Sequence, residues 1–151
     1  MKAIFHLHTI YSKDSIIKPE TLIKIAKKLN VNTICVTDHN TLKGYYKLRK
    51  ISNGIEILPG IEINCKEGDL IALNCEVEFK KGISCYEVID IVKENDGITI
   101  APHAFDLARK GLREVLFKAK IDAIEIFNSR NFDKFDRLAL TASEILRKSL
   151  I

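Results

Sequence analysis

The sequence lacks the long apolar run that a membrane-spanning segment needs. Its 151 residues are 46% hydrophobic, an ordinary fraction for a globular protein, and no apolar stretch approaches the roughly 18 residues required to cross a bilayer. From Met1 onward the chain moves straight into a strand-like pattern, without the apolar core and cleavage site of a secretory signal. We therefore expect a cytoplasmic protein that begins at Met1 and does not associate with membranes.

The sequence also has no block of basic residues. It carries 24 Lys and Arg against 20 Asp and Glu, a net charge of +4, and the two signs are interspersed. A duplex-binding protein usually concentrates its positive charge on one face. The short face formed by Lys24, Lys27 and Lys28 fits a solvated helix exterior, so duplex nucleic-acid binding is not expected.

Cys-x-x-Cys pairs are absent as well. Cys35, Cys65, Cys75 and Cys85 are widely spaced, and in a chain without a secretory signal this spacing favours reduced thiols. Cys35 lies in an apolar run, where a free cysteine acts as a small hydrophobic residue. A structural zinc site built from these cysteines is not expected.

Strand-like and helix-like patterns alternate along the chain. Short apolar or β-rich runs typical of strands occur at residues 2–7, 33–37, 55–58, 70–79, 98–101 and 121–127. Helical spacing of apolar residues begins near Pro19, Thr41, Ser84 and Phe135, and Ser84 with Glu87 forms a capping box. The alternation predicts a single α/β domain over residues 1–151 with a mainly parallel sheet. A complete (β/α)₈ barrel takes about 200–250 residues, so we expect only part of a barrel.

The strands are expected to share one buried sheet. Its core should contain the apolar residues Ile4, Ile34, Val36, Ile57, Ile100, Ile124 and Ile126.

Four histidines lie where predicted strands end: His6, His8, His39 and His103. In parallel α/β folds the carboxyl ends of the strands share one edge of the sheet, and ligands collect there. Because His6 and His8 are two residues apart on a strand, their side chains point to the same face. One cation could bind both, although two unrelated polar residues at a strand end give the same short pattern.

Three carboxylates accompany the histidines. Asp14 lies in the loop after the first strand and can swing back toward the same edge. Asp38 precedes His39 and could orient an imidazole through its second nitrogen, the usual role of a carboxylate beside a metal-bound histidine. Glu62 lies between two isoleucines, where a carboxylate must be paired with a lysine or bound to metal.

These residues define a candidate metal site. The proposed ligands are His6, His8, Asp14, His39, Glu62 and His103, and the residues expected to serve catalysis are Glu62, His103 and Asp38. Imidazole and carboxylate without thiolate suit Zn, Mn or Fe and disfavour Ca or Mg alone. One tetrahedral zinc takes at most four protein ligands, so six candidates indicate two or more ions.

Six segments form an ordered set: FHLHT (5–9), DS (14–15), ICVTDHN (34–40), PGIEI (59–63), APH (101–103) and IEIFNSR (124–130). In order and spacing this set resembles the PHP (polymerase and histidinol phosphatase) family of metal-dependent phosphoesterases. The resemblance implies a distorted (β/α)₇ barrel with a two- or three-metal site at the carboxyl ends of its strands. It also implies hydrolysis of a phosphate ester, with a nucleotide or short oligonucleotide as the favoured substrate over histidinol phosphate.

Two family features are missing from the sequence. The last family motif, Asp-x-His on a strand after the final helix, does not occur, because the sequence ends at Lys148-Ser149-Leu150-Ile151. The family histidine expected after Glu62 is replaced by Asp69, which is either an oxygen ligand or a solvated turn residue. We therefore expect an incomplete barrel that lacks its last strand and exposes a sheet edge, through which a homo-oligomer could form.

Arg109 and Arg130 are the cations expected to bind substrate phosphate, since guanidinium matches phosphate bidentately. Ordinary surface arginines are the alternative, and the stretch 103–111 resembles the phosphate-side loop of nucleotide-acting family members. Besides a phosphoesterase, two other functions stay open. One is a metal-binding module that has lost catalysis with the missing motif, and the other is a half-barrel that completes its fold with a partner chain.

Overall fold

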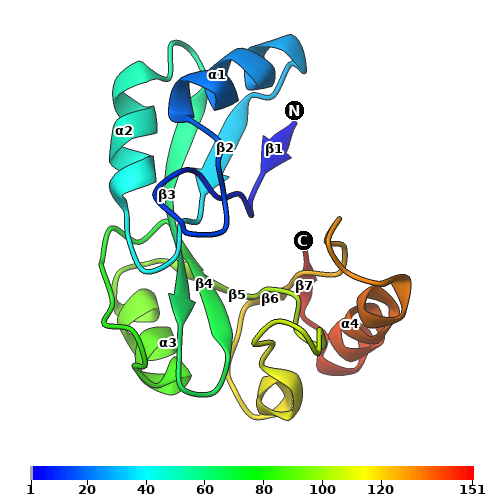
Figure 1. The fold of residues 1–151 in the computed structure, drawn as a ribbon. Coiled ribbons are helices and arrows are strands. Elements are labelled where there is room, and N and C mark those ends of the chain that lie inside the picture. The colour runs from blue at the N-terminus through cyan, green and yellow to red at the C-terminus, as the bar shows by residue number, and fades with distance from the viewer. Residues whose placement is uncertain (1) are drawn as a thin grey trace.

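A curled, seven-stranded sheet lies at the centre of the computed structural model, which describes residues 2–151 (Figure 1). In the sheet the strands follow their order along the chain. They are β1 (Ala3–Ile4), β2 (Thr33–Val36), β3 (Glu56–Asn64), β4 (Asp69–Leu73), β5 (Ile98–Ala101), β6 (Ala123–Ile124) and β7 (Ser149–Leu150). Only β4 runs antiparallel to its neighbours, β3 and β5. The predicted α/β class with a mainly parallel, incomplete barrel is confirmed.

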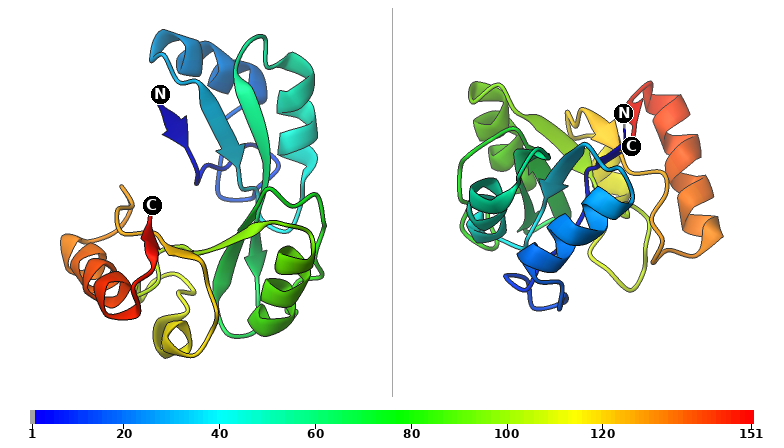
Figure 2. Two further views of the ribbon diagram at one scale, coloured as in Figure 1. Left: turned by 180° about the vertical axis from the view of Figure 1, so that it is seen from behind. Right: turned by 90° about the horizontal axis from the view of Figure 1, so that it is seen from above.

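The helices lie on the outside of the curl, and both chain ends lie on its open side (Figure 2). The α-helices are α1 (Pro19–Lys28), α2 (Lys43–Ile51), α3 (Cys85–Glu94) and α4 (Asp133–Leu146), and the segment Arg113–Phe117 forms a 3₁₀ helix, η1. Each α-helix directs an apolar stripe at the sheet and leaves its charged face in solvent. Within residues 2–151, no helix combines the length and apolarity that a membrane span requires.

Alternate residues of each strand pack on opposite sides of the sheet. Ile34 and Val36 belong to the main core beneath the helices, whereas Cys35, Ile71 and Ile100 form a second cluster on the other face. Both clusters are almost completely shielded from solvent. The strands therefore need apolar residues at consecutive positions, which is why they read as unbroken apolar runs.

Three of the seven expected core residues are only partly buried. Ile34, Val36, Ile100 and Ile124 are buried as predicted, but Ile4, Ile57 and Ile126 pack at the margin of the core. Ile4 lies on the edge strand β1, and Ile126 lies beyond the end of β6. Each of these two residues therefore lacks a neighbouring strand on one side.

All four cysteines are free and buried. Burial raises the pKa of the Cys35 thiol to about 12, so the side chain stays protonated at neutral pH. The expected role of Cys35 as a small hydrophobic residue is confirmed.

The extended segments are shorter than the sequence pattern suggests. The predicted strand at 70–79 ends at Leu73, because Asn74 adopts a left-handed conformation with φ of 54° that turns the chain out of the sheet. The expectation that no strand follows the last helix is wrong, since Ser149–Leu150 pairs in parallel with β6. β1 and β7 are the two sheet edges of the described chain, and pairing with another copy through them stays a prediction.

The N-terminus of α3 is capped from a different part of the chain than the sequence predicts. Ser84 makes no side-chain capping bond of its own, and its hydroxyl donates instead to Glu67 at 3.0 Å. The other carboxylate oxygen of Glu67 accepts the Cys85 N–H at 2.7 Å. Glu67, in the turn before β4, therefore caps the helix in place of Glu87. Its carboxylate also places negative charge at the positive end of the helix dipole.

This cap predicts a difference between two otherwise similar substitutions. Burial opposes the charge of Glu67, but the Cys85 N–H and Ser84 hydroxyl lower its pKa below the ordinary 4.5. Glu67→Gln should cost about 1 kcal/mol of unfolding free energy, and Glu87→Gln, the matched control, almost nothing. Because the pKa of Glu67 is depressed on folding, the difference should be present above pH 4.5 and shrink as the pH falls below it. Urea denaturation at pH 7 and pH 3 measures both effects, and equal losses in the two variants would contradict the assignment.

Candidate metal centre

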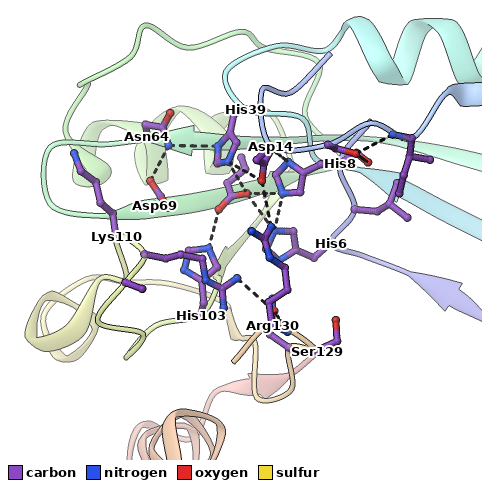
Figure 3. Close-up of a pocket in the computed structure, with 17 residues that line it drawn as sticks. His6, His8, Asp14, His39, Asn64, Asp69, His103, Lys110, Ser129 and Arg130 are labelled. Atoms are coloured by element: carbon purple, nitrogen blue, oxygen red, sulfur yellow. Dashed lines mark hydrogen bonds and ion pairs between the residues drawn. The ribbon is translucent and has the colours of Figure 1, made fainter. Parts of the chain in front are cut away.

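One end of the sheet gathers the predicted ligands, of which Figure 3 labels the four histidines and Asp14. His6 and His8 follow β1, His39 follows β2, Glu62 lies in β3, and His103 follows β5. The chain after β2 continues alongside β3, since His39 forms a parallel bridge with Glu62. Strands whose carboxyl ends meet at one edge therefore bring together residues almost a hundred positions apart in the sequence.

Glu62 lies at the centre of the four imidazoles. Its Oε1 is 2.9 Å from His103 Nε2, and its Oε2 is 3.1 Å from His6 Nε2, 2.9 Å from His8 Nε2 and 3.7 Å from His39 Nε2. The side chain is 1% exposed. Burial opposes its charge, but the hydrogen bonds with His103, His6 and His8 lower its pKa well below the ordinary value. Glu62 is therefore a buried anion that is held by imidazole nitrogens.

The arrangement fits divalent cations. Two groups of ligand atoms, from His6, Glu62 and His103 and from His8, His39 and Glu62, each lie within 4.8 Å of one another. The Nε2 atoms of His6 and His8 are only 3.1 Å apart and face the same carboxylate oxygen, so a proton or a cation must lie between them. Nδ1 of His103 is the one buried side-chain nitrogen or oxygen without a hydrogen-bond partner among residues 2–151. Glu62 belongs to both groups and is therefore placed to bridge two ions.

The carboxylates around His6 favour its protonated form. Burial disfavours a charged His6, but hydrogen bonds with Glu125 and Glu62 outweigh it and raise the pKa of His6 to about 10. Metal binding at this position must therefore displace a proton.

Asp14 reaches the mouth of the cluster, as its loop position suggests. Its carboxylate oxygens lie 3.7 Å from His8 Nδ1 and 3.9 Å from His39 Nε2, and the side chain is about one-third exposed. The structure therefore brings all six proposed ligands to the same end of the sheet.

Asp38 does not orient an imidazole, so that expectation is wrong. Its buried carboxylate accepts the Thr9 N–H at 2.6 Å and the Thr9 hydroxyl at 2.7 Å. Gly44 of α2 packs so closely that a Cβ there would lie 1.9 Å from Asp38 Oδ2. Asp38 therefore fixes the backbone directly after His8, and the short side chain of Thr9 takes the place expected of a histidine.

Asp69 lies on the wall of the same pocket and is buried rather than solvated. Its Oδ1 accepts a hydrogen bond from Asn64 Nδ2 at 2.9 Å, and Asn64 Nδ2 also lies 3.3 Å from His39 Nδ1. Burial raises the pKa of Asp69. Asp69 is outside both ligand groups, so the structure links it to the cluster through Asn64.

Glu125 is a site residue that sequence reasoning did not single out. Its Oε1 lies 2.7 Å from His6 Nδ1, and its Oε2 accepts the His103 N–H at 2.7 Å. The residue is 4% exposed. Glu125 lies between Ile124 and Ile126, the same acid-between-isoleucines pattern that marked Glu62, so the signal was present in the sequence.

The cluster opens into a pocket of about 580 Å³ that both predicted phosphate ligands line. Arg109 is held by Asp106 at 2.8 Å and also donates to Asn128 and Asn131. Arg130 is mostly exposed and lies 3.4 Å from Asp14. Lys110, which the sequence did not suggest, adds a third cation to the wall (Figure 3).

Comparison with known proteins places this geometry in a family. The sequence profile of the PHP domain matches residues 5–148. The chain belongs to the PHP family. Family membership supports a metal-dependent hydrolase, in agreement with the nitrogen and oxygen ligands at the end of the sheet.

Two proteins of Methanocaldococcus jannaschii are similar in sequence. The uncharacterised protein MJ1587 is 35% identical over 145 residues, which cover 88% of this chain and 85% of that protein. MJ0417, also uncharacterised, is 36% identical over 138 residues, but this chain spans only 54% of its length. Among solved structures, a candidate metal-dependent phosphoesterase from Bifidobacterium adolescentis has a TM-score of 0.80 at 16% identity, covering 99% of this chain and 85% of that one. This last likeness shows a shared PHP-type fold.

The ligand geometry predicts that metal stabilises the fold. At a free Zn²⁺ or Mn²⁺ concentration about 100 times the Kd, binding adds about 2.7 kcal/mol, which raises the Tm by roughly 5–10 °C for a chain of this size. Glu62→Gln removes the shared anion and should abolish most of that increase, whereas Glu94→Gln, on the exposed end of α3, should retain it. Thermal denaturation with and without a chelator measures the effect. An equal metal-induced increase in the Glu62→Gln variant would exclude Glu62 as a ligand.

Proposed function

We propose that this protein is a metal-dependent phosphoesterase whose substrate is a nucleotide or a short oligonucleotide. The observation that carries the proposal is the pairing of two ligand groups around Glu62 with arginines on the wall of the same pocket. Two or more Zn, Mn or Fe ions suit the nitrogen-rich ligands. Four free thiols support a reducing, cytoplasmic location.

The protein's own residues have separate tasks in this proposal. His6, His8, His39, His103, Asp14 and Glu62 would hold the ions. When bound, the ions would acidify water and neutralise charge that develops on the phosphate. Arg109 uses three of its five N–H donors on Asp106, Asn128 and Asn131, which leaves two for a phosphate oxygen. Fixed in this way, the guanidinium can bind substrate with little loss of side-chain entropy.

Hydrolysis of p-nitrophenyl phosphate and of bis(p-nitrophenyl) phosphate tests the reaction class. The Mn²⁺-loaded wild type should cleave at least one of them. Glu62→Gln should lower kcat/KM by more than about 100-fold, because loss of the shared anion would weaken the binding of the ions that supply several kcal/mol of charge stabilisation. Glu94→Gln should match the wild type. An inactive wild type that binds metal would favour a metal-binding module without catalysis. Activity gained on adding a peptide that carries an Asp-x-His strand would favour a barrel completed by another chain.

Arg109→Ala should act chiefly on substrate binding. Loss of a charge-assisted hydrogen bond predicts a KM about 10-fold higher with kcat little changed, provided that Arg109 binds the phosphate equally in the ground and transition states. Arg137→Ala on the exposed face of α4 is the matched control. Steady-state kinetics of the three proteins separates the two constants, and an unchanged KM in Arg109→Ala would remove Arg109 from the substrate site.

A further inference from the structure

Every acceptor position of the Glu125 carboxylate is occupied. Oε1 lies 2.7 Å from His6 Nδ1, and Oε2 accepts the backbone N–H of His103 at 2.7 Å. The amide nitrogen of Asn128 lies 3.0 Å from both oxygens. Such complete pairing in a buried position fixes the carboxylate in one orientation.

For His6 this contact decides which nitrogen faces the cluster. A carboxylate at Nδ1 keeps the proton on that nitrogen and leaves Nε2 directed at Glu62, where the ligand atoms converge. Without Glu125, the ring could rotate or place its proton on Nε2, and either change removes a ligand from the first group.

For His103 the contact acts on the backbone. The residue has φ of 34°, a left-handed conformation that a non-glycine residue rarely adopts and that another interaction must hold. The bond from its N–H to Glu125 supplies that interaction. The same conformation turns the imidazole toward Glu62, 2.9 Å away.

Asn128 extends this network to the phosphate side of the pocket. Its amide nitrogen donates to Glu125. Its Oδ1 accepts a hydrogen bond from Arg109 Nη1 at 3.3 Å and another from the backbone N–H of Arg130 at 3.0 Å. One side chain therefore contacts both the carboxylate behind the metal ligands and the two predicted phosphate-binding residues.

We propose that Glu125 is a positioning residue that orients His6 and His103 toward the cations, and that Asn128 couples this orientation to Arg109 at the substrate end of the pocket. The metal part stands on the ligand geometry, and only the coupling to substrate rests on the proposed function. Glu125 acts through the ligands and does not itself touch the ions.

Metal titration of Glu125→Gln tests the orientation of the ligands. In either orientation the new amide places an NH₂ group against the N–H of His6 or of His103, so one of the two contacts is lost. The Zn²⁺ and Mn²⁺ affinities of the metal-free protein should fall about 10- to 100-fold, and the visible absorption bands of the Co²⁺-loaded protein should shift. Glu94→Gln should show neither effect. Unchanged affinity within twofold together with an unchanged Co²⁺ spectrum would overturn the proposal.

Asn128→Ala tests the coupling. If Glu125→Gln does not fold, the same variant also tests whether Glu125 orients the metal ligands. The substitution removes the support of Glu125 and of Arg109 together, so both metal affinity and the affinity of the metal-loaded protein for inorganic phosphate should fall, each about fivefold. A variant that lost neither would refute the link. A wild type that binds metal but hydrolyses no phosphate ester would end the proposed function and leave the role of Glu125 intact, whereas one that binds neither Zn²⁺ nor Mn²⁺ would overturn both.

Discussion

The Glu62 carboxylate is surrounded by the imidazoles of three different strand ends and is almost entirely removed from water. Burying an unpaired anion carries a large desolvation free energy. The four nearby imidazoles offset it only if protons or cations lie between them and the carboxylate. This constraint explains why the loops after β1, β2 and β5 converge on a single point of β3.

A second layer of buried carboxylates keeps that centre in place. Asp38 accepts the backbone N–H of Thr9, directly after His8, and Glu125 accepts the backbone N–H of His103. Neither belongs to the two groups of ligand atoms. Because loops are the least constrained parts of a fold, their position at this site depends on these charged anchors.

Much of the fold and of the ligand cluster could be predicted from the sequence. The same physical reasons limit what such a prediction can include. The apolar runs around Ile34 and Ile100 identify buried parallel strands, and the strand-end rule then brings the histidines together. Contacts between distant side chains are invisible to that reasoning. Glu67 rather than Glu87 caps α3, and Asp38 meets Thr9 rather than an imidazole, because each partner is set by tertiary packing. Strands end earlier than the apolar pattern predicts where a single left-handed residue such as Asn74 turns the chain away from the sheet.

Gly44 shows how far the centre extends into the scaffold. Glycine has a lower helix propensity than alanine, so helix propensity alone would favour alanine at Gly44, the second residue of α2. The close approach of Asp38 leaves no space for a methyl group there. Substitution at this position is therefore limited by Asp38, which holds the backbone after His8, rather than by the helix. A survey of tolerated mutations would find Gly44 as intolerant as the buried Tyr45 and Leu48 of the same helix, although the side chain that excludes a methyl group there, Asp38, is not one of the six proposed metal ligands.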